Sequence, residues 1–143
     1  MIHLNPLYNQ IGGKRPLHKS SVIGVRMDPQ SSRVCASAST DGKCYITSCY
    51  VKGVDTDSNG PFGSVTSFGE KLISLSAVGW INCVTFSPSA TTLCFASHDG
   101  ELNFADVTKA ALKEKSKPDK VFYKGNPFLS GVFLNESKNI LNY

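Results

Sequence analysis

The sequence predicts an all-β protein built from repeated four-stranded antiparallel meanders. Short runs rich in β-branched and aromatic residues are separated by turn signals, and the same order of runs and turns occurs twice within the 143 residues. A third copy begins near Phe128 and contains one strand and the start of another. Repeats of this kind are typical of the blades of a β-propeller, so we expect an incomplete propeller with two blades and the start of a third.

The first copy contains strands predicted over residues 22–27, 34–39 and 43–48. Pro29 follows the first run and ends it, because proline cannot donate a hydrogen bond to a strand ladder and fixes its own φ. Asp41-Gly42 separates the second run from the third, and glycine is free to adopt the positive φ that a tight turn requires.

The second copy contains strands predicted over residues 81–86, 93–97 and 101–105. Its turn residues stand at the same places as in the first copy, with Pro88 after the first strand and Asp99-Gly100 between the second and third strands. Outer strands predicted over residues 70–75 and 120–124 complete the two blades. Matched turn residues at matched positions favour propeller blades over an unrelated β-sandwich.

These repeats divide the chain into four parts. We expect residues 1–17 to hold an outer strand of a preceding blade and a lead-in, and residues 18–78, 79–124 and 125–143 to hold the first blade, the second blade and the start of the third. Residues 52–68 are rich in Gly, Ser and Asp and predict a long insertion. Residues 107–119 predict a charged connector with a weak helical signal.

The composition describes a soluble globular chain, with 41% hydrophobic and 18% charged residues and a net charge of +4. No apolar run approaches the ~18 residues that span a membrane, and the first residues lack the apolar core of a signal peptide. The five cysteines form no C-x-x-C pair, and basic residues are not interleaved with aromatic ones. We therefore expect a cytoplasmic protein without a metal, cofactor, membrane or nucleic-acid partner.

His18 stands four residues before the first strand, where the Gly-His pair of a WD40 repeat stands, although leucine replaces the glycine here. In WD40 blades this histidine can bond the aspartate of the tight turn, which would be Asp41. The alternative makes His18 and Cys35 or Cys44 the catalytic pair of a thiol hydrolase, for which no third, orienting group is identifiable. The residues expected to have structural turn roles are His18, Asp41, Gly42, Asp99, Gly100 and Asp106.

The WD40 pattern is degenerate in both copies. Thr47-Ser48 occupies the Trp-Asp positions of the first blade, and Ala105-Asp106 keeps only the aspartate in the second. Ala77 stands at the second blade's histidine position. We therefore expect the blades to depend more on apolar packing than on the hydrogen-bonded tetrad of a regular WD40 repeat.

Further motifs resemble one WD40 family in particular. They are Lys43-Cys44-Tyr45, the run YVKGVD from Tyr50 to Asp55, Phe68-Gly69 after the insertion, Gly79-Trp80-Ile81, Ser97-His98-Asp99, and NPFLSGVFLNESKNIL near the end of the chain. In this combination they resemble the WD40-repeat subunit of the actin-related protein 2/3 complex, over about residues 15–141.

The resemblance implies a non-enzymatic scaffold that supports nucleation of branched actin filaments through protein–protein contacts. Its implied partners are the other subunits of the complex, the actin filament and nucleation-promoting activators, and its implied location is the cytoplasmic actin cytoskeleton. The alternative is a WD40 adaptor that presents a peptide or substrate to another protein machine, unrelated to actin.

The predicted contact surface is the end of the blades that bears the Asp-Gly turns. Its candidate residues are Lys19, Lys43, Trp80, His98 and Phe128. Trp80 suits an interface anchor because it stands at a loop–strand junction, but it could equally fill the gap between blades. His98 is expected to be a turn residue rather than a ligand.

Overall fold

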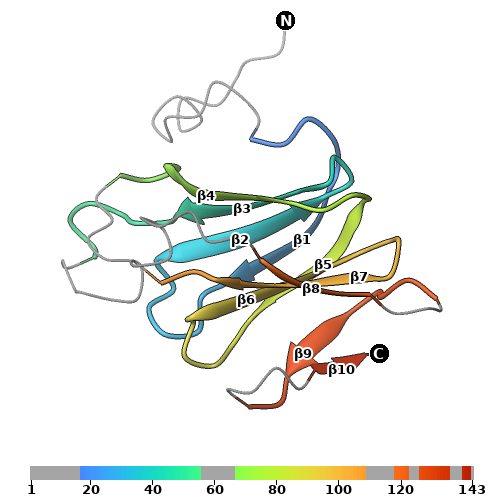
Figure 1. Ribbon diagram of the computed structural model, residues 1–143. Helices are drawn as coiled ribbons and strands as arrows, with labels where there is room; N and C mark the ends of the chain where they lie inside the picture. The colour runs from blue at the N-terminus through green and yellow to red at the C-terminus, as the bar shows by residue number, and fades with distance from the viewer. Residues whose placement is uncertain (1–16, 56–66, 109–117, 123–125, 136–139, 143) are drawn as a thin grey trace, which may run out of the picture.

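The computed structural model describes residues 17–55, 67–108, 118–122, 126–135 and 140–142. These residues form the strands β1 (Val22–Met27), β2 (Val34–Ser39), β3 (Lys43–Ser48), β4 (Lys71–Ser76), β5 (Ile81–Phe86), β6 (Thr92–Ser97), β7 (Glu101–Asp106), β8 (Asp119–Phe122), β9 (Gly131–Phe133) and β10 (Ile140–Asn142), shown in Figure 1. No described segment forms a helix, and so none forms one that could cross a membrane. The prediction of an all-β fold is confirmed.

The strands form two four-stranded sheets, ordered β1-β2-β3-β4 and β5-β6-β7-β8, and a β9-β10 hairpin. Every neighbouring pair is antiparallel, as expected for blade meanders. The two sheets share a bulge at matched positions, between Val22 and Gly24 in β1 and between Ile81 and Cys83 in β5. The repeat is therefore one of detailed geometry as well as of strand order.

Several predicted features lie wholly or partly outside the described residues. They are the proposed strand within residues 1–16, the greater part of the insertion (56–66) and the weak helical signal (109–117). The other differences are small: β4 begins and ends one residue later than predicted, β6 begins one earlier, β7 ends one later and β8 begins one earlier, while residues 123–124 of the predicted outer strand lie outside the described residues. Strand ends vary by this much because the terminal residues pair with the ladder on only one side.

The first proline turn is held by a buried carboxylate. Asp28 accepts hydrogen bonds from the backbone N–H groups of Gln30 (3.0 Å), Ser31 (2.7 Å) and Arg33 (3.0 Å). The Gln30 side chain then donates from Nε2 to the Pro88 carbonyl at 2.6 Å. The proline turns of the two sheets are thus tied directly to each other.

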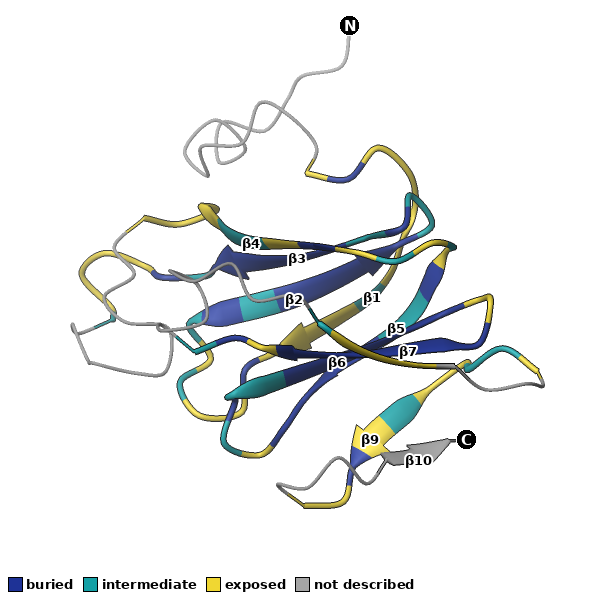
Figure 2. Ribbon diagram, in the orientation of Figure 1, coloured by how far each residue is buried: buried dark blue, intermediate teal, exposed yellow. Residues whose placement is uncertain are grey.

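An apolar layer fills the space between the two sheets, which lie one above the other in Figure 1. The first sheet contributes Val34 and Ile46, and the second contributes Ile81, Leu93 and Phe95, all of them fully buried. Figure 2 shows the buried residues concentrated on the strands β2, β3, β6 and β7. Each fully buried side chain of this size contributes roughly 1.5–3 kcal/mol to stability.

A second, smaller core lies on the other face of the second sheet. Cys94, Leu102 and Phe104 pack there with Phe133 of β9, and the rings of Phe104 and Phe133 meet edge to face at 6.5 Å. The second sheet is therefore covered on both faces, and β9 begins a further layer.

The run from Tyr50 to Asp55 closes on itself after β3. Tyr50 donates its hydroxyl to the Asp55 carbonyl at 3.1 Å, and the backbone N–H of Val51 donates to the Asp55 carboxylate at 2.6 Å. Gly53 has φ = 87° within this turn, a conformation that favours glycine. The turn gives a physical reason for the Tyr, Gly and Asp of this motif.

A buried carboxylate that was not predicted from the sequence lies in the layer between the sheets. Glu101 of β7 is fully buried, and Nζ of Lys120 in β8 lies 2.7 Å from its Oε1. Burial alone would raise the pKa of the Glu101 carboxyl, but Lys120 and other nearby donors hold this pKa below its usual value. The carboxylate is therefore kept ionised by a partner that reaches it from the outer strand.

Replacement of Lys120 by methionine should expose the cost of this buried charge. We expect Lys120→Met to lower the free energy of unfolding by about 1–3 kcal/mol, measured by urea denaturation, because Glu101 loses its partner. The double variant Lys120→Met/Glu101→Gln should regain part of this loss, because a neutral amide costs less to bury. Equal losses in the single and double variants would contradict this account, and the exposed Lys52→Met is the control.

The strand β1 leaves apolar side chains exposed at the edge of its sheet. Val22, Ile23 and Val25 are each 49% exposed and Met27 is 45% exposed. Apolar edge strands favour pairing with other chains, so we expect the 143-residue chain to scatter light with a mass above that of one molecule.

Substitutions on β1 distinguish association through this edge strand from non-specific association through other exposed apolar residues. The double variant Val22→Thr/Val25→Thr should shift the chain toward the monomer mass, because it reduces the apolar surface of the edge. Val54→Thr, at a loop residue that is 78% exposed, should leave the mass unchanged. A wild-type chain that stays monomeric at every concentration tested would argue against the expectation.

Candidate interaction surface

The first Asp-Gly turn is tied to the lead-in of its blade by one carboxylate. The Asp41 carboxylate accepts a hydrogen bond from His18 Nδ1 at 3.1 Å. It also accepts hydrogen bonds from the backbone N–H groups of Lys19 and Lys43, both at 2.9 Å. His18 Nε2 lies 2.7 Å from Ser37 Oγ, and the ring of Tyr45 packs against the imidazole with centroids 4.5 Å apart. A carboxylate only accepts, so Nδ1 carries the proton, and in the neutral ring Nε2 accepts from Ser37.

These contacts set the charge of Asp41. Burial alone would raise the pKa of this carboxyl, but the hydrogen bonds from Lys19, Lys43 and His18 outweigh burial and lower it. The turn therefore contains a stable carboxylate at neutral pH. The expected pairing of His18 with Asp41 is present in the structure at hydrogen-bonding distance.

Ser37, His18 and Asp41 share the connectivity of a hydrolytic serine–histidine–aspartate triad, but they are placed differently. Ser37 is 8% exposed and His18 is 7% exposed, and Tyr45 covers the imidazole. A nucleophile must reach its substrate, so this burial supports a structural role that ties the loop to the sheet.

Of the two cysteines considered as nucleophiles, Cys35 and Cys44, Cys44 is fully buried, and the nearby Cys49 is also affected by burial. Burial raises the pKa of the Cys44 thiol to about 12, and burial together with Cys35 raises that of Cys49 to about 12. Thiolate is the reactive form, so these thiols are weak nucleophiles near neutral pH. His18 bonds to Asp41 and Ser37, and no bond between it and Cys35 or Cys44 is present among the described residues.

The second Asp-Gly turn repeats the backbone of the first. Gly42 and Gly100 have φ of 75° and 77°, and each donates its N–H to the carbonyl three residues earlier, Ser39 at 3.2 Å and Ser97 at 3.3 Å. The turns are also neighbours in space, because Gly79 lies between them: a Cβ added to Gly42 would come within 3.3 Å of the Gly79 carbonyl oxygen, and one added to Gly79 would overlap the Asp99 carboxylate. The two turns and the second lead-in thus share one end of the sheets.

Trp80 lies at this end and points outward. It is 57% exposed, and its ring stands 5.8 Å from the ring of His98 with the planes tilted by 42°. Gly79, Trp80, His98 and Asp99 line a hollow of about 270 Å³. We call these four residues the turn pocket. The exposed ring does not fill the space between the sheets, which is the alternative role considered for it.

The remaining sequence-predicted residues are dispersed. Lys19 is exposed beside Asp41, and Lys43 donates from Nζ to Ser76 Oγ at 2.6 Å. Phe128 is half-buried against the second core, and its carbonyl accepts from the Asn82 side chain at 3.2 Å. Asp106 lies at the opposite end of β7 from Gly100, where it accepts the Thr108 N–H at 2.9 Å. Asp106 is therefore not part of the turn end.

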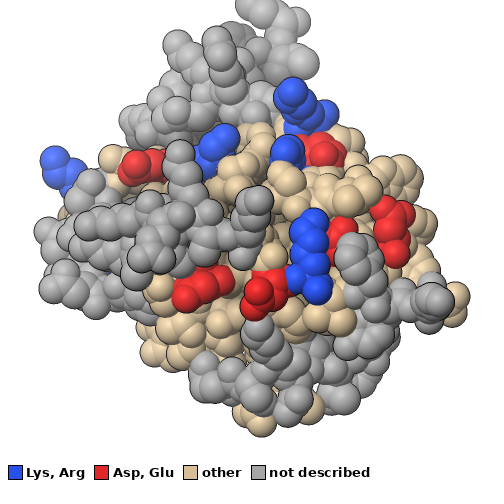
Figure 3. Space-filling model, viewed as in Figure 1, with Lys and Arg blue, Asp and Glu red and all other residues tan. Residues whose placement is uncertain are grey.

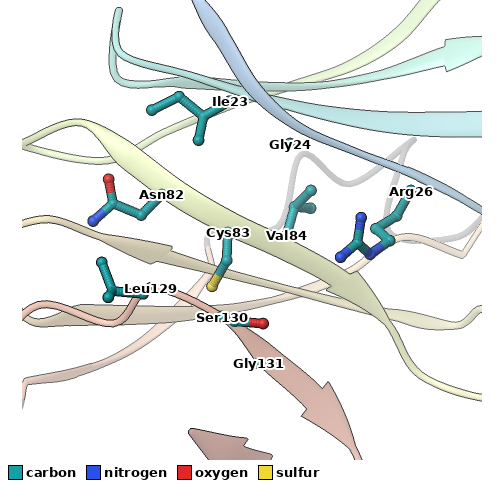
Figure 4. Close-up of a pocket in the computed structure, with 9 residues that line it drawn as sticks. All are labelled: Ile23, Gly24, Arg26, Asn82, Cys83, Val84, Leu129, Ser130 and Gly131. Carbon is teal, nitrogen blue, oxygen red and sulfur yellow. The ribbon is translucent and has the colours of Figure 1, made fainter. Parts of the chain in front are cut away.

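A second hollow, of about 170 Å³, lies where β1, β5 and the start of β9 meet (Figure 4). Its polar side chains include Arg26, Asn82 and Cys83. Arg26 already donates to the Val25 carbonyl, and Asn82 donates to Phe128. Burial raises the pKa of the Cys83 thiol. Because Arg26 and Asn82 already make hydrogen bonds within the chain, the turn pocket is the better candidate for a partner-binding site.

Charge does not single out either hollow. Lys and Arg side chains are scattered among Asp and Glu on the described part of the face drawn in Figure 3. Within the described residues, no cluster of three or more His, Cys, Asp or Glu could hold a metal ion. The turn end presents an exposed aromatic ring, that of Trp80, beside the Asp99 carboxylate.

Asp41 should contribute measurably to stability. We expect Asp41→Ala to lower the free energy of unfolding by ~1–3 kcal/mol, because the buried His18 ring and the Lys19 and Lys43 N–H groups lose their acceptor. The pKa of Asp41 is lower in the folded state, so its contribution is present above the unfolded pKa of about 4 and is lost as pH falls through the folded value. Urea unfolding at several pH values tests both, and an unchanged stability would contradict the pairing with His18.

Comparison with known proteins identifies relatives in one complex. No protein-family model matches the chain. Actin-related protein 2/3 complex subunit 1A of Arabidopsis thaliana is 39% identical over 124 residues, which are 85% of this chain and 32% of that protein. Subunit 1A-B of Xenopus laevis is 30% identical over 131 residues, which are 89% of this chain and 34% of the relative. Subunit 1 of Schizosaccharomyces pombe is 32% identical over 93 residues, which are 64% of this chain and 24% of the relative.

The chain spans about a third of the length of the curated relatives it matches. Within that third, a match over 85% of this chain includes both described sheets. The resemblance inferred from the sequence is confirmed: the chain is similar, over most of its length, to subunit 1 of the actin-related protein 2/3 complex.

Proposed function

We propose that the chain is a non-enzymatic scaffold in the actin-related protein 2/3 complex and supports nucleation of branched actin filaments through protein–protein contacts. The observation that carries this proposal is 39% identity to a subunit of that complex over 85% of the chain. The proposed partners are the other subunits, the actin filament and nucleation-promoting activators, in the cytoplasmic actin cytoskeleton.

The chemistry of the described residues supports a role without catalysis. The Ser37–His18–Asp41 group is buried beneath Tyr45, and the thiols of Cys44 and Cys49 have raised pKa values. The turn end instead presents an exposed aromatic ring, Trp80, and the exposed carboxylate of Asp99 beside the ends of strands. Binding residues are commonly held in this way, on loops that a rigid scaffold positions.

We propose that the turn pocket and the neighbouring Lys19 and Lys43 form the contact surface, with Trp80 as its central residue. A large aromatic ring that is more than half exposed in the free chain has much apolar area to bury in a complex. Tryptophan is also among the residue types that contribute most to binding energy at interfaces.

The test is assembly with defined partners. The purified chain is mixed with a recombinant actin-related protein 2/3 complex prepared without subunit 1, and co-elution is followed by size-exclusion chromatography. We expect the chain to co-elute with the complex, and Trp80→Ala to weaken this association by about tenfold or more. The matched control is Phe68→Ala, an aromatic residue of similar exposure (48%) that lies ahead of β4.

The outcomes separate this proposal from the alternative of an adaptor unrelated to actin. Failure to co-elute, by a chain whose circular dichroism shows folded β-structure, would argue for the alternative. Equal weakening by Trp80→Ala and Phe68→Ala would leave the scaffold role intact but would remove the turn pocket from the contact surface.

A further inference from the structure

The two Asp-Gly turns differ in what their aspartates bind. Asp41 is held by three donors, from His18, Lys19 and Lys43. Asp99 occupies the matching position in the second sheet, is exposed, and has no side-chain hydrogen bond with any residue in the described part of the chain. The same backbone turn therefore carries a hydrogen-bonded carboxylate in the first sheet. In the second sheet it carries an exposed carboxylate that can accept hydrogen bonds from a partner.

The cause of this difference lies in two replaced partners. Ala77 stands where His18 stands in the first copy, and the strand registers place Phe95 where Ser37 stands. Neither alanine nor phenylalanine can donate a side-chain hydrogen bond. Phe95 is fully buried and contributes to packing instead, so Asp99 is not needed to hold the blade together.

The available carboxylate stands in a shaped site. The Asp99 carboxylate lies against Gly79, where an added Cβ would overlap its Oδ2 and come within 2.9 Å of its Cγ. The Trp80 and His98 rings form the rest of the pocket, and the His98 N–H is fixed to the Trp80 carbonyl at 2.7 Å. An aromatic face and a carboxylate thus open into the same hollow of about 270 Å³.

We propose that the turn pocket binds an arginine side chain of a partner protein. A guanidinium is planar and can stack on the Trp80 ring while donating two hydrogen bonds to the Asp99 carboxylate. A lysine ammonium could also lie over the Trp80 ring, but it lacks the planar surface that stacks and the two parallel N–H donors that match a carboxylate, so arginine fits better. This inference rests on the proposed role of the turn surface in protein contact, and names the side chain that the surface receives.

A small probe tests the pocket without requiring assembly of a complex. Trp80 is the only tryptophan in the sequence, so intrinsic tryptophan fluorescence reports on this site alone. The chain is titrated with Nα-acetyl-arginine amide and, in parallel, with Nα-acetyl-citrulline amide, a neutral compound of nearly the same shape. We expect a saturable change with the arginine compound, with a dissociation constant on the order of millimolar, and a much weaker response to the citrulline compound.

Two variants examine the carboxylate in different ways. Asp99→Asn removes its charge, and Gly79→Ala displaces it while leaving the charge and the tryptophan in place. Each should weaken binding by about threefold to tenfold. The matched control is Asp106→Asn, at an exposed aspartate on the opposite end of β7, which should bind as the wild type does.

The proposal is overturned if the fluorescence change is linear without saturation, or if arginine and citrulline compounds act equally. It is also overturned if Asp99→Asn binds as tightly as the wild type. Because the probe is a single amino-acid derivative, a negative result here would leave co-elution with the complex unaffected, and a failed co-elution would not alter the titration.

Discussion

The apolar layer between the two sheets is the constraint on which the rest of the structure depends. Neither four-stranded sheet can bury this face alone, and the fully buried Ile46 and Phe95 are covered only because the sheets pack together. Burial of one such side chain is worth roughly 1.5–3 kcal/mol, more than the ~0.5–1.5 kcal/mol of a typical net hydrogen bond. The positions of the turns, and so of the exposed residues, follow from this packing.

Polar contacts between the sheets add specificity to this layer. The Gln30 side chain donates to the Pro88 carbonyl and so joins the proline turn of one sheet to that of the other. This bond fixes the relative position of the sheets at the end that bears the proline turns, whereas the bond from the Ala77 N–H to the Gly42 carbonyl continues the β3–β4 ladder within the first sheet. An apolar layer alone is not directional, and it would leave this position less well defined.

The strands could be predicted from the sequence because their signals are local. Alternating apolar residues, Pro29 and Pro88, and the two Asp-Gly turns act over a few residues, and the structure differs from the predicted bounds by single residues. The pairing of His18 with Asp41 was predictable only from the pattern of WD40 blades, since the two residues are 23 apart in sequence.

The Glu101–Lys120 pair shows what local signals cannot supply. Nineteen positions separate these residues, and their contact depends on the register in which β8 joins β7. The sequence of β7 alternates Glu101 and Asn103 with Leu102 and Phe104, a pattern that predicts one solvent-facing side. In the structure residues 101–105 are all buried, because cores lie against both faces of the second sheet. Burial of the polar side therefore depends on packing between sheets, which a local pattern does not report.

The outward direction of Trp80 was likewise undetermined, since a junction residue can turn toward either the core or solvent. The core position is already filled, because Ile81 beside it is fully buried in the layer between the sheets. Side chains on neighbouring strand residues point to opposite faces, so burial of Ile81 directs Trp80 away from this layer.

The loss of the tetrad in the second blade has an energetic explanation that bears on function. Replacing the serine position by the fully buried Phe95 exchanges hydrogen bonds of ~0.5–1.5 kcal/mol each for apolar burial of roughly 1.5–3 kcal/mol. The blade can therefore keep its Asp-Gly turn without the aspartate's bonds, because Gly100 supplies the positive φ and the backbone bond to Ser97 closes the turn. The aspartate of the second turn is thus not required for the closure of that turn, and the proposed contact uses this aspartate rather than Asp41, which is held by His18, Lys19 and Lys43.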